Sequence, residues 1–112
     1  MQIIDIEALN EMFFGDTSKV KLVVDALIQR IPEWQEEAKI CASANDPQEI
    51  RQLCHRIRGA ASTIKAEKLT EAATNLGDII KANNFDKTQA AFVHLNRCLE
   101  EIGILSSDDL TS

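Results

Sequence analysis

The spacing of apolar residues limits this chain to helical structure. Between positions 20 and 41, apolar side chains recur every third or fourth residue, at Val20, Val23, Val24, Leu27, Ile28, Ile31, Trp34, Ala38 and Cys41. This spacing places them on one side of a long α-helix, which buries that side. Pro32 lacks a backbone donor and crowds the preceding turn, so we expect a kink or a brief break there.

A short helix is expected before this long one. Asp5 is a good N-cap, and Gly15 ends the apolar pattern that follows it. Its apolar positions are Ile6, Leu9, Met12 and Phe13.

A third helix begins at a strong start signal. Asp46 is a capping aspartate, Pro47 occupies the first helical position, and Glu49 stands three residues after the cap. We expect this helix to run to about Ile64. Its apolar positions are Ile50, Leu53, Cys54, Ile57, Ala60, Ala61 and Ile64.

Two further helices complete the pattern. The fourth spans about 69–80 and ends at Asn83 and Asn84. Asp86 and Gln89 repeat the capping-box spacing, which predicts the start of a fifth helix that ends near position 103. The inward positions of these helices are Leu69, Ala72, Ala73, Leu76, Ile79 and Ile80, then Ala91, Phe92, Leu95, Cys98, Leu99 and Ile102.

These elements predict an all-α fold, an antiparallel four-helix bundle with an additional short N-terminal helix. With 112 residues, 45% of them apolar, the chain has enough material for one core. We therefore expect one domain over residues 1–105, a frayed polar tail over 106–112, and a monomer.

Charge and hydropathy exclude two classes of partner. A formal net charge of -6 disfavours nucleic acid, because duplex binding depends on Lys and Arg. No apolar run is long enough to cross a membrane, and the basic and apolar regions of a signal peptide are absent. We expect a cytoplasmic segment that makes no membrane contact and binds protein.

The cysteines carry no predicted chemistry. Cys41, Cys54 and Cys98 form no CxxC pair, and they lie at or beside apolar helical positions. They are interpreted as small buried hydrophobes in a reducing cytosol. A zinc site or a Cys-His enzyme is disfavoured, because metal-ligand spacing is absent and Cys54 and His55 point in different directions.

His55 is the candidate reactive residue. It falls on the polar face of the third helix, where at least one ring nitrogen is expected to be open to solvent and to a partner. Arg51 and Arg58 lie on adjacent turns of that face and could neutralise a phosphoryl group. Glycine in the middle of a helix lowers helix stability, but Gly59 has no side chain and lets another protein's backbone come close.

The surroundings of His55 favour protein docking. Five basic residues and one acid lie between positions 51 and 68, in a chain that is acidic overall. A basic surface suits docking onto an acidic, metal-binding pocket. The candidate partner-binding residues are Arg51, Gln52, Arg56 and Ser62.

The segment His55-Arg56-Ile57-Arg58-Gly59-Ala60-Ala61 resembles the signature of histidine-containing phosphotransfer (HPt) domains, of the kind found in hybrid sensor histidine kinases. Matching positions follow at Leu69, Ala73 and Leu76, and the regions around 14–16 and 32–33 are similar to the family's first two helices. Two positions depart from the family pattern. Lys65 stands where glycine is frequent, and Gly77 stands where a glutamate or glutamine often lies near the imidazole.

The resemblance implies a phosphorelay intermediate without kinase activity of its own. His55 would be the phosphoacceptor, Arg58 the cation that neutralises the phosphoryl charge, and Gly59 the clearance residue. The partners would be response-regulator receiver domains, which supply the divalent cation, expected to be Mg²⁺; this chain would need no cofactor or metal of its own. An alternative is a scaffolding bundle that docks receivers without carrying phosphate. His94, with Cys98 at its clearance position, is interpreted as a packed or partly exposed bundle residue.

Overall fold

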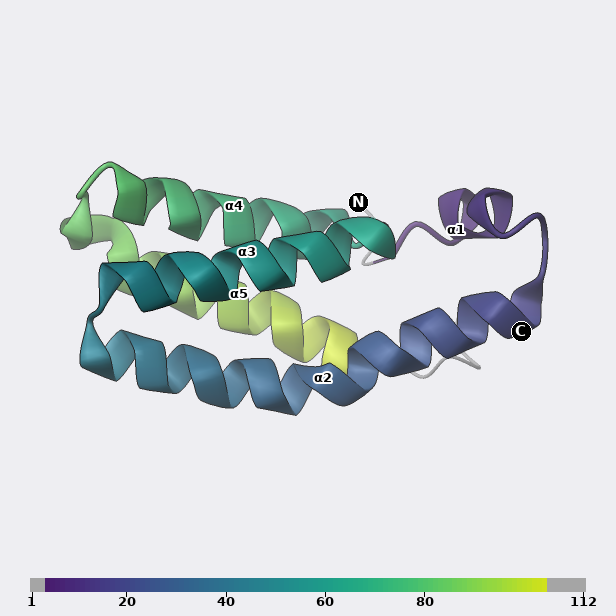
Figure 1. Ribbon diagram of the computed structural model, residues 1–112, viewed down its shortest axis with the longest axis horizontal. Coiled ribbons are helices and arrows are strands. Elements are labelled where there is room, and N and C mark those ends of the chain that lie inside the picture. The colour runs from purple at the N-terminus through teal and green to yellow at the C-terminus, as the bar shows by residue number, and fades with distance from the viewer. Residues whose placement is uncertain (1–3, 105–112) are drawn as a thin grey trace.

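The computed structural model describes residues 4–104, and this part of the chain is all-α, as predicted. The expected polar tail at 106–112 lies outside the described residues. The elements in chain order are α1 (Ile6–Met12), α2 (Thr17–Ala44), α3 (Pro47–Thr63), α4 (Glu67–Lys81), the short 3₁₀ helix η1 (Phe85–Lys87) and α5 (Thr88–Gly103) (Figure 1). Over residues 4–104, no helix is long and apolar enough to cross a membrane.

The four long helices form the bundle. α3 packs against α2 and α4, and α5 packs against α4 and α2, so each helix has two neighbours around a common core. Short turns join consecutive helices, which therefore run in opposite directions (Figure 1). α1 lies beside the N-terminal end of α2, beyond the ends of α3 and α5. The expected architecture of four helices and a short N-terminal helix is confirmed.

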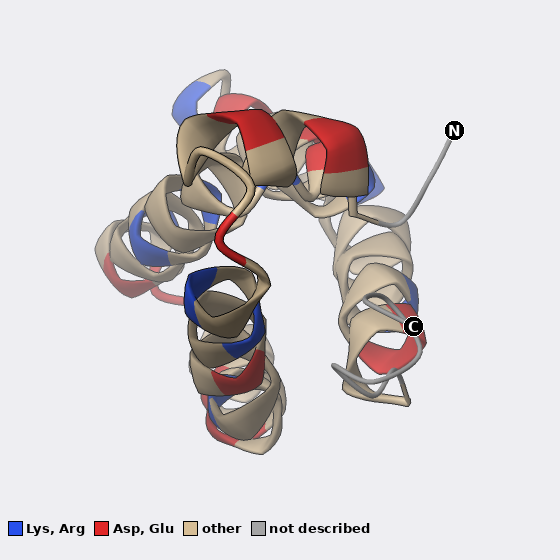
Figure 2. Ribbon diagram, turned by 90° about the vertical axis from the view of Figure 1, so that its right-hand side faces the viewer, with Lys and Arg blue, Asp and Glu red and all other residues tan. Residues whose placement is uncertain are grey.

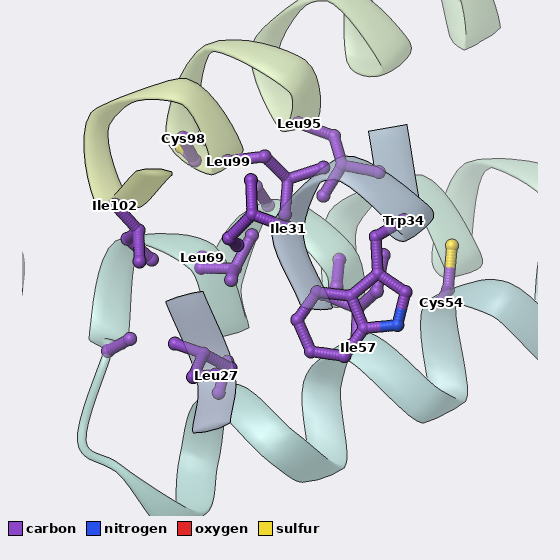
Figure 3. Close-up of a cluster of buried hydrophobic side chains, with 14 of the residues drawn as sticks. Leu27, Ile31, Trp34, Cys54, Ile57, Leu69, Leu95, Cys98, Leu99 and Ile102 are labelled. Carbon is purple, nitrogen blue, oxygen red and sulfur yellow. The ribbon is translucent and has the colours of Figure 1, made fainter. Parts of the chain in front are cut away.

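The core consists largely of the predicted apolar positions, with Ile4 and Ala66 in addition. Trp34 is fully buried and lies among residues of all four long helices (Figure 3). Among the positions predicted to face inward, Met12, the last residue of α1, is exposed. Seven others are half-buried and pack against the core, namely Ile6, Phe13, Val23, Ile28, Ala60, Ile79 and Phe92. The apolar spacing thus identified most of the side chains that hold the bundle together.

α2 continues through Pro32 without a break. The expected brief break is therefore wrong, although Pro32 removes one backbone hydrogen bond. Pro32 lies on the exposed side of the helix, whereas Ile31 and Trp34 are buried against the other helices. Because Ile31 and Trp34 are buried before and after the proline, tertiary packing keeps the helix continuous despite the missing backbone hydrogen bond.

Side-chain caps begin three of the helices. The carboxylate of Asp5 accepts a hydrogen bond from the backbone N–H of Ala8 at 3.1 Å, and Asp16 caps α2 in the same way. Asp46 accepts from the backbone N–H of Gln48 at 3.0 Å, as the start signal of α3 predicted. Such caps satisfy donors that the helix cannot pair internally.

The predicted cap of the fifth helix is wrong. Asp86 lies inside η1, and α5 begins at Thr88 after Lys87, with no side-chain hydrogen bond at the cap. A capping residue needs extended backbone, but Lys87 is already in the helical region at φ -96° and ψ -5°. η1 therefore runs directly into α5.

Candidate functional site

The imidazole of His55 stands on the exposed side of α3. Its neighbours Cys54 and Ile57 point into the core, whereas His55 itself is exposed. Within the described part of the chain, no hydrogen bond or ion pair involves the ring. His55 is therefore not held by packing or by an internal partner, and its nitrogens can meet another molecule.

His55 lines a groove between α3 and α4. The α3 side includes Gln48, Arg51, Gln52, Arg56 and Arg58, and the α4 side includes Thr74, Gly77, Asp78 and Lys81. Most of the candidate residues therefore share one concave surface. Gly59 and Ser62 do not line this groove; both are exposed farther along α3.

Gly59 faces open space. A Cβ atom built on this residue would meet nothing within 4 Å outside its own helix. Close helix packing inside the bundle therefore does not explain a glycine in the middle of α3. The open surface fits the approach of a second molecule along the turn that follows His55.

The three arginines of the groove differ in their partners. Arg56 Nη2 donates to Glu37 Oε2 at 2.8 Å, which joins α3 to α2. Arg51 and Arg58 are exposed, and no ion pair involves either of them among residues 4–104. Arg51 and Arg58 thus carry the free guanidinium groups of α3, whereas the charge of Arg56 is partly neutralised.

Charge is distributed unevenly over the molecule. Four basic residues line the groove, namely Arg51, Arg56, Arg58 and Lys81, against the single acid Asp78. α1, which lies far from the groove, carries only acidic charged residues, as the view from its end shows (Figure 2). The local positive charge around His55 favours an anionic group or an acidic partner surface.

The α4 wall was largely missed by sequence reasoning, which singled out only Gly77 in this helix. Thr74, Asp78 and Lys81 stand at spacings of three and four residues beside the buried stripe of α4. Residues at this spacing share one face of a helix, so the spacing could have identified them in the sequence as one surface of α4. Thr74 is already engaged, because its hydroxyl donates to the carbonyl of Thr70 at 2.8 Å.

Gly77 and Cys54 meet at the floor of the groove. A Cβ atom at Gly77 would lie 3.7 Å from the Cβ of Cys54, an ordinary van der Waals distance. Burial raises the pKa of the Cys54 thiol to about 12, with a smaller contribution from Cys41. Burial likewise raises the pKa of Cys41 and Cys98. A neutral, buried thiol is a poor nucleophile and a poor metal ligand.

The second histidine lies elsewhere. His94 is exposed on α5, and its Nε2 atom is 3.9 Å from Cys98 Sγ. It lines a separate shallow hollow together with Asp78 and Lys87. In the described ranges no cluster of three or more His, Cys, Asp and Glu side chains is arranged to bind a metal ion.

Comparisons with known proteins bear on the family and the fold. The family model described as "Hpt domain" matches residues 9–103. The crystal structure of histidine-containing phosphotransfer protein B (HptB) from Pseudomonas aeruginosa PAO1 superposes with a TM-score of 0.80 at 17% sequence identity, covering 96% of this chain and 94% of that chain. At that identity the superposition establishes the fold. No curated protein sequence matches significantly.

Proposed function

Since the chain belongs to the Hpt domain family, we propose that it is a phosphorelay intermediate that carries a phosphoryl group on His55 between receiver-domain aspartates. The observation that carries the proposal is the exposed ring of His55, in a groove that also holds Arg51 and Arg58. An imidazole nitrogen free of internal hydrogen bonds is available as a nucleophile toward phosphorus.

The chemistry requires few catalytic groups. In each transfer the bond between phosphorus and the donor atom breaks as the bond to the acceptor atom forms, with donor and acceptor in line. The phosphoryl group moves from an aspartate of one receiver to an imidazole nitrogen of His55, and later from that nitrogen to an aspartate of another receiver. Positioning and charge neutralisation account for most of the catalysis.

Each of the two proteins supplies part of the transfer site. In this proposal the receiver supplies the aspartate and binds the divalent cation, expected to be Mg²⁺. This chain supplies the imidazole of His55 and the guanidinium of Arg58, one turn farther along α3. Neither role requires kinase activity in this domain.

The surface around His55 suits a docked receiver. Gly59 adds no side chain to the turn after the histidine, so a partner backbone can approach α3 closely. Gln52 and Ser62 are exposed on α3 and can donate and accept hydrogen bonds, and Arg51 adds positive charge. We assign these residues to the receiver contact, together with Arg56.

The test is phosphoryl transfer from a receiver. A receiver domain phosphorylated with ³²P in the presence of Mg²⁺ is expected to label the wild-type protein. The His55→Gln variant is expected to remain unlabelled, whereas His94→Gln should label at the wild-type rate. Equal labelling of the His55→Gln variant would overturn the proposal. Receiver binding without any labelling of the wild type would support the scaffolding alternative instead.

A further inference from the structure

We propose that the outer face of α5 pairs with the same face of a second copy of this chain, in an antiparallel two-fold dimer. The face is formed by Val93, Arg97, Glu100 and Ile104, and we call it the α5 face. It is a surface that the proposed function does not use, so the two can be tested separately.

The α5 face is one stripe along the helix. Its members follow one another at intervals of four, three and four residues, the spacing that keeps side chains on one side of an α-helix. Ile104 comes directly after the last residue of α5, and its backbone is still in the right-handed helical region at φ -88° and ψ -5°. It therefore continues the stripe. All four side chains are exposed.

The two ends of the stripe are apolar. Val93 is 55% exposed and Ile104 is 83% exposed. Single exposed apolar residues are common on protein surfaces, but these two share one helix face and lie about three turns apart. Contact with a second molecule along this face would remove both side chains from water.

The centre of the stripe carries opposite charges. Arg97 and Glu100 are exposed, and over residues 4–104 no ion pair involves either of them. Asn96 Nδ2 donates to Glu100 Oε1 at 3.1 Å, and Gln35 Nε2 of α2 donates to Asn96 Oδ1 at 3.2 Å. The carboxylate of Glu100 is thus held in place from α2, and its second oxygen can accept a bond from another molecule.

An antiparallel arrangement brings these residues into register. A two-fold axis at the middle of the stripe places Val93 of one copy opposite Ile104 of the other, and Arg97 of one copy opposite Glu100 of the other. Both contacts then occur twice, as a two-fold interface requires. A parallel arrangement would instead set Arg97 against Arg97, which repels. Charge complementarity therefore identifies the occupant of the α5 face as a second α5 face.

The dimer would leave the surface around His55 accessible. α3 and α5 each pack against α2 and α4, so they lie diagonally opposite in the bundle. His55 faces outward from α3, and the α5 face points outward from the other side of the molecule. Because each copy contributes a single helix face, we expect weak association, with a Kd on the order of 0.1 mM.

The experiment is sedimentation equilibrium of the full chain at low salt, from about 10 µM to about 1 mM, on either side of that Kd. The mass of the wild type is expected to rise from that of a monomer toward that of a dimer. Arg97→Glu sets acid against acid in both contacts and should raise the Kd by about tenfold. Glu100→Arg should have the same effect. The double variant Arg97→Glu/Glu100→Arg should restore dimerisation, because it exchanges the two charges and keeps the attraction.

The apolar ends have a matched control. Val93→Ser is expected to raise the Kd by about fivefold, because it removes an apolar contact at both ends of the interface. Ile40→Ser removes a side chain that is 60% exposed on α2, outside the α5 face, and should leave the Kd unchanged. Urea unfolding of each variant confirms that it is folded and measures any change in stability separately.

A wild-type protein that remains monomeric at about 1 mM, the state expected from the sequence, would overturn the inference. A dimer whose Kd is the same in Arg97→Glu would overturn it as well, since that dimer would use another surface. Failure of the double variant to restore association would exclude the antiparallel register.

Discussion

Gly77 of α4 lies directly over Cys54 of α3, so that a Cβ atom on the glycine would contact the Cβ of the cysteine at 3.7 Å. This is an ordinary van der Waals distance, so a Cβ atom fits at this position. The absence of a side chain at position 77 is therefore a property of the sequence and is not imposed by the packing of the two helices.

Gly77→Gln is expected to fold and to be more stable than the wild type by about 0.5 kcal/mol, because glutamine is the better helix former. The longer side chain can reach the imidazole, so we expect labelling from a phosphorylated receiver to be at least as fast. Urea unfolding and a transfer time course measure the two effects. A loss of more than about 1 kcal/mol would mean that the groove floor has no room for a side chain.

Gly59→Leu is expected to separate docking from folding. An added Cβ meets nothing within 4 Å, so the free energy of unfolding should rise by about 0.5–1 kcal/mol. Transfer from a receiver should nevertheless fall by at least about tenfold, because the leucine obstructs the approach to α3. Gly59→Ala is the matched control with a smaller obstruction. Normal transfer by Gly59→Leu would refute the clearance role.

The arginines of α3 should differ in their contributions. Arg58→Ala is expected to slow transfer by about tenfold, the effect of losing one charge-assisted contact to the phosphoryl group. Arg56→Ala should slow it less, because Glu37 already partly neutralises Arg56. Initial rates of ³²P transfer compare the two variants. A larger loss in Arg56→Ala would reverse this assignment.

Lys65 occupies the turn between α3 and α4 at φ +61°, in the left-handed region. The backbone N–H of Asp5 donates to its carbonyl at 2.9 Å, which ties the chain before α1 to this turn. Lys65→Gly is expected to stabilise the protein by about 0.5–1 kcal/mol, because glycine adopts this conformation without strain. Thermal unfolding checks the sign. Destabilisation would show that the lysine side chain makes a contribution larger than the strain.

The raised pKa of Cys54 predicts a loss of stability at alkaline pH. The buried thiol ionises near pH 12 in the folded protein but near its ordinary value of about 8.5 when unfolded, so the folded state retains its proton over a wider range. The contribution of Cys54 to the free energy of unfolding is fully present below about pH 8.5. Above that pH the free energy of unfolding should fall by up to about 1.4 kcal/mol per pH unit. Urea unfolding of wild type and Cys54→Ala between pH 8 and 10 tests this. Parallel curves for the two proteins would contradict it.

The apolar spacing was sufficient to predict the helices, their order and most of the buried side chains, because the period of an α-helix is a local property. The exposure of His55 followed from the same spacing, since the buried stripe of α3 leaves the histidine on the opposite side. The caps at Asp5 and Asp46 were equally local. The cap at Asp86 was not, because Lys87 already has helical backbone and η1 continues directly into α5.

The second wall of the groove depends on tertiary structure. No local pattern states how far α3 and α4 are rotated about their own axes, and that rotation places Gly77 over Cys54 and Lys81 in the same groove as His55. The ion pair between Arg56 and Glu37 likewise needs two helices at a particular distance. The sequence by itself determined that His55 is exposed on α3, because the apolar spacing is local. The packing of the helices decided which charged side chains surround His55, because it depends on contacts between residues far apart in the sequence.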